Sequence, residues 1–312
     1  MTNDELKRRR IGVLMGGFSS EREISLKTGN AILRALKGSG YQVVGIDADR
    51  SLARTLEQER IEIAFIALHG PWGEDGTVQG LLEMMRIPYT GSNVIASAIA
   101  MDKEVSKKMF LYHHLPTPAF QVLRPDAVAA GISLPLPVVV KPVCGGSSIG
   151  TKIVRTEKEL AESLQQAARY DNRLLVEKYV DGNDLTVGII EGEFLPVIEI
   201  IPKSGFYDFT AKYNVGETEY LVPAPIPAET TAKVQALAVS AYQALSCSGA
   251  ARVDFRMDSA GDLTILEVNT IPGLTETSLL PKAAALAGID FVALTERILA
   301  SARLHIGCGA SG

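Results

Sequence analysis

Two hydrophobic segments near the C-terminus carry polar side chains at the same two-residue spacing. Arg252 and Asp254 interrupt the first segment, and Glu267 and Asn269 interrupt the second. In a β-strand, side chains at positions i and i+2 point to the same face. Two adjacent strands of this kind would gather two carboxylates, an amide and a guanidinium in one patch. Since hard divalent cations prefer oxygen ligands, the pattern predicts a sheet that holds magnesium beside phosphate.

Length and charge limit the kinds of protein that this chain can be. Its 312 residues favour two or three packed units over one. With 46% apolar and 21% charged residues, the chain can bury a sizeable core. Its net charge of −5 argues against a nucleic-acid partner. We therefore expect any phosphate group to meet a few locally placed cations.

Cysteine usage and the N-terminal segment bear on the compartment. Cys144, Cys247 and Cys308 are too few and too scattered for a disulfide framework or a zinc site. The basic residues 7–10 precede a hydrophobic segment, 11–15, that is too short for a signal peptide or a membrane span. These features predict a cytoplasmic protein without a membrane partner.

Alternating strand and helix patterns organise the first third of the chain. We predict strands at 11–15, 41–46, 63–68 and 138–141, and helices at 93–115 and from 282 onward. Residues 11–92 thus form an open parallel α/β unit, in which ligands gather at the carboxyl ends of the strands. The fold class is α/β, in part α+β.

A lysine and a glycine–serine loop form a candidate phosphate site. Residues 145–150 follow the strand of Lys141, and glycines let backbone amides approach an anion closely. No Walker ending is present, so a flexible hairpin is the alternative. A buried lysine needs an anionic partner, which favours the phosphate site for Lys141. From the residues alone, Lys103 is an ordinary solvated helix lysine.

Two later segments could complete a nucleotide site. Glu177 interrupts a hydrophobic strand, and this strand with Asp184 could line a nucleotide slot or form a hairpin with a polar edge. Residues 206–213 are aromatic and polar without a clear period. They predict either a loop that closes over a site and excludes water, or a surface loop anchored by aromatic side chains.

The turn after the first strand carries acidic residues. A carboxylate at Glu21 would repel a phosphate, so this turn is not a phosphate site. Ser20 and Glu23 fit a helix capping box. Glu21 could complement the helix dipole or bind a substrate ammonium. His69 ends the third strand, where it is either a ligand-binding residue or a structural hydrogen-bonding residue.

Taken together and in this order, the motifs resemble the D-alanine–D-alanine ligases of the ATP-grasp superfamily. The matching segments are 16–25, 67–70, 73–76, 101–103, the Lys141 strand with the serine loop, 207–213, 252–254 and 267–273. The resemblance covers nearly the whole chain and implies a three-domain architecture. Residues 1–95 would form an open parallel α/β substrate domain. Residues 96–182 and 183–312 would form a central and a C-terminal catalytic ATP-grasp domain, both α+β, that clasp ATP.

The resemblance also implies a nucleotide site. Lys103, Lys141 and Ser147 would contact the ATP phosphates, and Lys212 would reach the γ-phosphate as its loop closes. Glu177 would read the adenine with the backbone near Lys178 and Val180. Asp184 would meet the ribose, where the family more often has glutamate, and Phe206 and Leu266 would line the slot. Asp254, Glu267 and Asn269 would hold two Mg²⁺ ions, with Mn²⁺ as an alternative.

The implied amino-acid site lies beside it. Glu21 would bind the ammonium of a first D-alanine, with His69 nearby. Ser147 and Tyr213 would connect through Glu21 and orient the second D-alanine. Arg252 and the Gly273 amide would stabilise an oxyanion, and Ser278 and Leu279 would meet the second carboxylate.

These roles imply ATP-dependent condensation of two D-alanines through an acyl phosphate, for peptidoglycan precursors, by a cytoplasmic homodimer. Tyr213 favours a dipeptide product, because a phenylalanine accompanies hydroxy-acid acceptance in similar ligases. One alternative is another ATP-grasp carboxylate–amine ligase, against which Glu21 and His69 argue. The other is a non-catalytic nucleotide-binding module, which would not need Arg252 together with the three proposed metal ligands.

Overall fold

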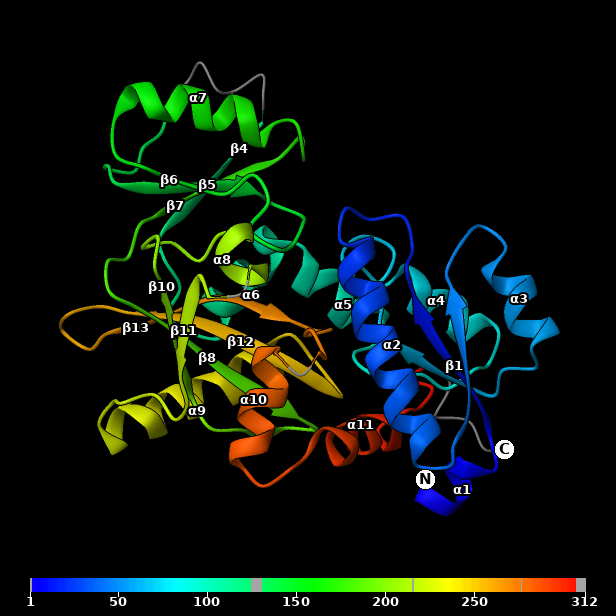
Figure 1. The fold of residues 1–312 in the computed structure, drawn as a ribbon. Helices are drawn as coiled ribbons and strands as arrows, with labels where there is room; N and C mark the ends of the chain where they lie inside the picture. Colours follow the sequence, from blue (N-terminus) through cyan, green and yellow to red (C-terminus); the bar gives the residue numbers. More distant parts are fainter. Residues whose placement is uncertain (1, 125–130, 215, 276, 307–312) are drawn as a thin grey trace.

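The N-terminal sheet of the computed structural model is parallel, with strand order β2–β1–β3 (Figure 1). The structure describes residues 2–124, 131–214, 216–275 and 277–306. The elements of this part are α1 (Asn3–Lys7), β1 (Arg10–Met15), α2 (Arg22–Gly38), β2 (Gln42–Asp47), α3 (Leu52–Gln58), β3 (Ile63–Ile66) and α4 (Thr77–Met84). All four residues of β3 are buried, as expected for a parallel strand covered on both faces. The predicted open α/β unit is therefore present.

A four-stranded antiparallel sheet, with strand order β4–β7–β5–β6, follows at the top of Figure 1. Its elements are β4 (Phe120–Leu123), β5 (Val138–Pro142), β6 (Lys152–Val154), α7 (Glu157–Ala167) and β7 (Leu174–Lys178). Helix α7 begins with a capping box in which Thr156 and Glu159 satisfy each other's backbone amides. Its apolar face covers the buried face of the sheet, and Leu160 and Leu164 belong to this small core.

The largest sheet has the order β11–β10–β8–β12–β13, and β9 pairs with β8. Its elements are β8 (Asn183–Ile190), β9 (Glu193–Phe194), β10 (Ile198–Pro202), α8 (Phe209–Tyr213), β11 (Thr218–Leu221), α9 (Ala228–Ala244), β12 (Ala250–Met257), β13 (Leu263–Asn269), α10 (Leu279–Leu286) and α11 (Phe291–Ala300). Alternate residues of β8 and β12, among them Val187 and Val253, form a core with α9. On the other face, α10 packs against β8 near Gly188, and Arg252 and Asp254 of β12 border the site.

The predicted helix over 93–115 is two helices, α5 (Val94–Met101) and α6 (Lys103–Tyr112). Asp102 has an extended backbone, with a ψ of 100°, and its carboxylate caps α6 by accepting the Val105 amide. The periodicity continues across the break, so hydrophobic spacing alone could not reveal it. The break makes Lys103 the first residue of a helix.

The predicted capping box of Ser20 with Glu23 was wrong. Helix α2 begins at Arg22, so Glu21 occupies the N-cap position, and its side chain makes no capping hydrogen bond. The Glu21 carboxylate is used elsewhere.

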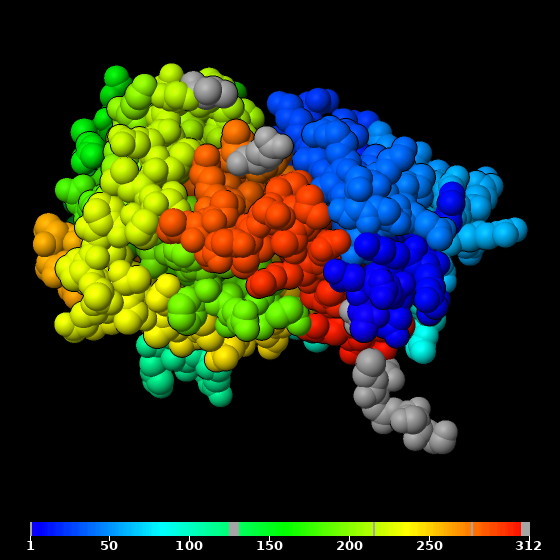
Figure 2. Space-filling model, turned by 60° about the horizontal axis from the view of Figure 1, so that its bottom comes forward, coloured from blue at the N-terminus to red at the C-terminus, as the bar shows by residue number. Residues whose placement is uncertain are grey.

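The C-terminal helices pack against the N-terminal unit, and Figure 2 shows the two chain regions side by side on the surface. One hydrophobic core contains Ile32 and Leu36 of α2 together with Leu294 and Ile298 of α11. In addition, Tyr89 is bridged both to β3 and to Arg303. The predicted boundaries at 95 and 182 stay a prediction, but the chain's last described residues help to fix the first sheet. In the described part of the chain, no helix is long and apolar enough to cross a membrane.

Candidate active site

Strands β12 and β13 form the predicted polar patch. They are antiparallel, with Arg252 opposite Asn269 and Asp254 opposite Glu267. The register then shifts at a bulge that follows Asp254. Bulges re-aim side chains beside many active sites. The structure therefore brings together the four residues that the two-residue spacing had singled out.

The charges of this patch are tightly paired. The Arg252 guanidinium donates to both carboxylate oxygens of Asp254, each at 2.8 Å. The hydroxyl of Thr186 also donates to Asp254, at 2.6 Å. Burial opposes ionisation of Glu267, but the surrounding cations outweigh it and lower the pKa of Glu267 to about 2. These cations are Lys103, Lys141, Lys212 and Arg252.

A cavity of about 440 Å³ opens beside this patch. All three sheets or their loops contribute to its wall. All residues of the predicted amino-acid site line it: Glu21, His69, Ser147, Tyr213, Arg252, Gly273, Ser278 and Leu279. Four residues of the predicted nucleotide and metal sites line it as well: Lys103, Lys212, Glu267 and Asn269. We name it the first cavity.

Glu21, Ser147 and Tyr213 are linked across this cavity. The Ser147 hydroxyl donates to the Glu21 carboxylate and lies 2.8 Å from the Tyr213 hydroxyl. Ser147 is therefore the middle member, where we had expected Glu21. A Cβ on Gly70 or Gly146 would come within 2.7 or 3.0 Å of a Glu21 oxygen. These glycines let the backbone approach the carboxylate closely.

Two buried titratable groups lie behind Glu21. Burial, helped by the charge of Arg252, lowers the pKa of His69 to about 4, so its imidazole is neutral at pH 7. Its Nε2 lies 3.2 Å from the Thr28 hydroxyl. Burial and the nearby Glu21 raise the pKa of Glu74 to about 8. Glu74 accepts the Gly70 amide at 2.6 Å. Glu74 belongs to the matching segment 73–76, from which we predicted no role for it.

A second cavity of about 120 Å³ lies between the central and C-terminal sheets. The predicted nucleotide residues line it, except Ser147, which lines the first cavity instead: Lys103, Lys141, Glu177, Lys178, Val180, Asp184, Phe206, Lys212 and Leu266. Two of the proposed metal ligands, Asp254 and Glu267, line it as well. Asp184 is paired with Arg256 at 2.8 Å, and burial raises the pKa of Asp184 in spite of this cation. Part of the predicted loop 206–213 is the short helix α8, and its Lys212 borders both cavities.

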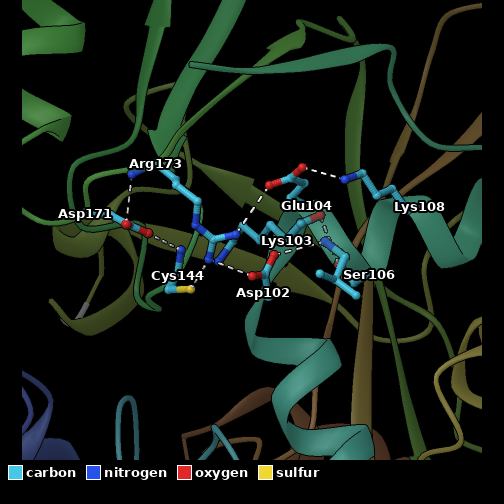
Figure 3. Close-up of polar contacts among 9 residues, drawn as sticks. Asp102, Lys103, Glu104, Ser106, Lys108, Cys144, Asp171 and Arg173 are labelled. Carbon is cyan, nitrogen blue, oxygen red and sulfur yellow. Dashed lines mark hydrogen bonds and ion pairs between the residues drawn. The ribbon is translucent and has the colours of Figure 1, made fainter. Parts of the chain in front are cut away.

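Lys103 is not the solvated lysine that its immediate sequence suggested. Figure 3 shows it at the start of α6, where Arg173 donates to the Asp102 carboxylate at 2.7 Å and to Glu104 at 3.3 Å. Lys103 is 8% exposed, and its ammonium donates to the Gly145 carbonyl at 2.6 Å. It also lies 3.5 Å from Glu267. The helix break thus aims Lys103 between the serine loop and β13.

Lys107 is a buried cation that we did not predict from the sequence. Its ammonium lies 2.8 Å from one Glu177 oxygen, and that of Lys141 lies 2.6 Å from the other. Its position in the sequence could have indicated burial, because Lys107 lies four residues after Lys103 and therefore on the same face of α6. Both oxygens of Glu177 face lysines, so its predicted contact with adenine stays a prediction.

The segment before α10 closes the first cavity. Ser278 occupies the N-cap position, and its hydroxyl accepts the Thr275 amide at 3.1 Å. A Cβ on Gly273 would come 3.1 Å from the Ser278 oxygen, which is a tight contact. The Gly273 backbone and the start of α10 therefore face the same space as Arg252.

Sequence comparison decides the family. Residues 113–300 match the family described as D-ala D-ala ligase C-terminus, and residues 49–92 match D-ala D-ala ligase N-terminus. The chain belongs to the D-alanine–D-alanine ligase family. The D-alanine–D-alanine ligase of Syntrophotalea carbinolica is 54% identical over 305 residues, which cover 98% of this chain and 100% of the relative. The resemblance inferred from the motifs is confirmed.

Solved structures of the family confirm the ATP-grasp fold. The D-alanine–D-alanine ligase from Bacillus anthracis complexed with ATP has a TM-score of 0.81 and 37% identity, with 94% of this chain and 97% of that chain covered. VanG D-Ala:D-Ser ligase from Enterococcus faecalis has a TM-score of 0.81 and 28% identity, with 94% and 98% covered. The ligase fold therefore accommodates different second substrates.

Proposed function

We propose that this protein joins two D-alanines to D-alanyl-D-alanine at the expense of ATP, for peptidoglycan precursors. The observation that carries the proposal is that the two cavities adjoin. Lys103, Lys212 and Glu267 line both of them. An amino acid in the first cavity would thus reach a phosphoryl group from the second. Family membership supports the same activity.

The first cavity suits the ammonium of a D-alanine. Glu21 offers a buried carboxylate, and none of the ion pairs found among the described residues includes it. A charge-assisted hydrogen bond from the substrate ammonium would satisfy it. We assign neutral His69 to the same substrate, as a neighbour that adds no competing positive charge.

The second cavity suits a nucleotide. We assign the phosphates to Lys103 and Lys141, and the γ-phosphate also to Lys212. The adenine edge would be read by the backbone at Lys178 and Val180 beside Glu177, as the resemblance implies. Asp184 would reach the ribose, with Phe206 and Leu266 as the apolar walls of the slot.

The donor set at the boundary of the cavities fits magnesium. Asp254 and Glu267 are opposite each other, and Asn269 adds an amide oxygen from the same strand. The low pKa of Glu267, about 2, keeps this ligand ionised at any physiological pH. We assign two Mg²⁺ ions to these three residues. When bound, they would neutralise charge on the transferring phosphoryl group.

The chemistry follows from the placement of the two substrates. The carboxylate of the first D-alanine attacks the γ-phosphorus of ATP, ADP leaves, and an acyl phosphate forms. The amine of the second D-alanine then attacks the acyl carbon, and phosphate leaves from a tetrahedral intermediate. Arg252 and the Gly273 amide would stabilise its oxyanion. Helix α8 and Tyr213 would keep water from the acyl phosphate.

The second D-alanine would lie at the far side of the first cavity. We assign its carboxylate to Ser278 and Leu279 at the start of α10, and its orientation to the pair Ser147 and Tyr213. We also propose that the enzyme acts as a homodimer in the cytoplasm. The reducing compartment inferred from the scattered cysteines supports this location.

One experiment separates this function from the alternatives. Purified protein is given ATP, Mg²⁺ and either D-alanine or L-alanine, and phosphate release and products are followed. We expect phosphate release and D-alanyl-D-alanine only with D-alanine. Release with another amino-acid pair instead would identify a different carboxylate–amine ligase, and nucleotide binding without any release would indicate a non-catalytic module.

A further inference from the structure

Three buried charged side chains meet at the wall of the second cavity, and their charges do not cancel. Lys107, Lys141 and Glu177 have side-chain exposures of 0%, 9% and 3%. They come from α6, β5 and β7 and share one carboxylate, so the cluster carries one surplus positive charge. Burying an unbalanced charge is strongly unfavourable unless a ligand or partner compensates it. The surplus positive charge therefore indicates an anionic ligand beside this cluster.

The two lysines of the cluster lie at different positions relative to the second cavity. Lys141 and Glu177 line the second cavity, whereas Lys107 lies behind them and does not. If Lys107 were absent, Lys141 and Glu177 would form a neutral pair facing the cavity. Because Lys107 shares the Glu177 carboxylate, the charge of Lys141 is only partly neutralised and can act on an anion in the cavity.

The Lys107 ammonium is held in place from other directions. It donates to the Thr117 hydroxyl at 2.8 Å, and Thr117 in turn donates to the Ile265 carbonyl of β13 at 2.9 Å. It also lies 5.7 Å from the centre of the Phe120 ring, a cation–π distance. These contacts fix the ammonium against Glu177 and link the central sheet to the strand that carries Glu267.

We propose that Lys107 is a positioning residue for nucleotide phosphate: it shares the charge of Glu177, so that Lys141 faces the cavity with a positive charge that Glu177 neutralises only in part. This rests on the proposed function in taking the ligand of the second cavity to be ATP. A purely structural role for Lys107 would be filled as well by a methionine of similar length, which has no charge to bury.

The test compares how much the phosphates add to nucleotide binding. Inhibition or dissociation constants are measured for adenosine and for the non-hydrolysable analogue AMP-PNP, and their ratio is the phosphate contribution. In Lys107→Met this ratio should fall about tenfold through weaker AMP-PNP binding, with adenosine nearly unchanged. The matched control is Lys108→Met, on the next residue of α6, whose side chain is 62% exposed and whose ion pair among the described residues is with Glu104. The control ratio should stay at the wild-type value.

A second variant separates charge from packing and serves if Lys107→Met folds poorly. Lys107→Met combined with Glu177→Gln removes one charge of each sign and restores the surplus on Lys141. We expect it to recover most of the lost phosphate contribution, and Lys107→Arg to retain it. An equal loss of adenosine and AMP-PNP binding in Lys107→Met, or no recovery in the double variant, would overturn the proposal. Because the experiment measures nucleotide binding, its result can contradict the role of Lys107 without contradicting the proposed D-alanine-dependent turnover.

Discussion

The two cavities of this enzyme hold buried charges in opposite ways. Around the first, none of the ion pairs found among the described residues includes Glu21 or Glu74, and the pKa of Glu74 is raised to about 8 by burial and by Glu21. Around the second, Glu177 and Glu267 lie among lysines. Among the described residues, the Glu21 side of the first cavity thus has no cation paired with its carboxylates, whereas two lysines share the charge of Glu177 beside the second cavity.

This difference in charge pairing indicates which cavity suits the D-alanine ammonium and which suits the ATP phosphates. A cavity with unpaired carboxylates gains most from an ammonium, and one with a lysine surplus gains most from phosphate. On the proposed assignment, D-alanine would occupy the first cavity and ATP the second, and the carboxylate of the first D-alanine would face the phosphates. The predictions below test each half of this contrast.

The largest effect is expected from Glu267→Gln at the boundary of the cavities. Turnover should fall at least about a hundredfold, because a charged ligand for the phosphoryl-transfer site is lost. Steady-state phosphate release checks the rate, and a thermal melt checks that the fold is intact. The matched control is Glu219→Gln, an exposed carboxylate on the edge strand β11. Retention of more than about a tenth of wild-type kcat would contradict the metal-ligand assignment.

Glu21→Gln tests the first cavity alone. The loss of a charge-assisted contact with the substrate ammonium should raise KM for D-alanine roughly thirtyfold, about 2 kcal/mol. KM for ATP should stay within about twofold, because the nucleotide site is separate from Glu21. A comparable rise in KM for D-alanine and in KM for ATP would contradict the assignment of Glu21 to the D-alanine ammonium alone.

Buried His69 should make stability depend on pH. Its native pKa of about 4 lies below the ordinary 6.5, so the unfolded chain binds more protons between these values. The neutral imidazole thus favours folding fully above pH 6.5, and this stability is lost as the pH falls towards 4. Between pH 7 and pH 5 the wild type should lose about 2 kcal/mol more than His69→Gln in denaturant unfolding. Parallel pH profiles of the two proteins would contradict the burial of a neutral imidazole.

The smallest effect concerns the second substrate. Tyr213→Phe removes the hydroxyl that lies 2.8 Å from Ser147, and we expect a larger share of D-alanyl-D-lactate when D-alanine and D-lactate compete. Product analysis by mass spectrometry measures the ratio. An unchanged ratio would remove Tyr213 from the choice of acceptor.

Local patterns predicted those parts of the molecule that local geometry determines. From their two-residue spacing we predicted that Arg252, Asp254, Glu267 and Asn269 lie together on adjacent strands, as they do on β12 and β13. The prediction was possible because strand periodicity determines which side chains point to the same face. The order of the motifs resembled that of a known family, and this resemblance predicted the ATP-grasp fold.

What the sequence could not show depends on contacts between distant segments. Lys103 and Lys107 are typical residues of a solvated helix face, and they are buried because α6 packs against α9 and β13 and because Glu177 of the central sheet pairs with Lys107. Arg173, far along the chain, fixes the helix break at Asp102. The middle position of Ser147 likewise requires the serine loop, α2 and α8 to meet, which no local pattern specifies.

The central claim is that a carboxylate held in the first cavity reaches the phosphate held in the second. The most direct measurement uses D-alanine with heavy oxygen in its carboxyl group, together with ATP and Mg²⁺, and determines the oxygen isotopes of the released phosphate. Attack by the carboxylate on the γ-phosphorus predicts one heavy oxygen in each phosphate released. Unlabelled phosphate, formed at the rate of dipeptide synthesis, would contradict this account.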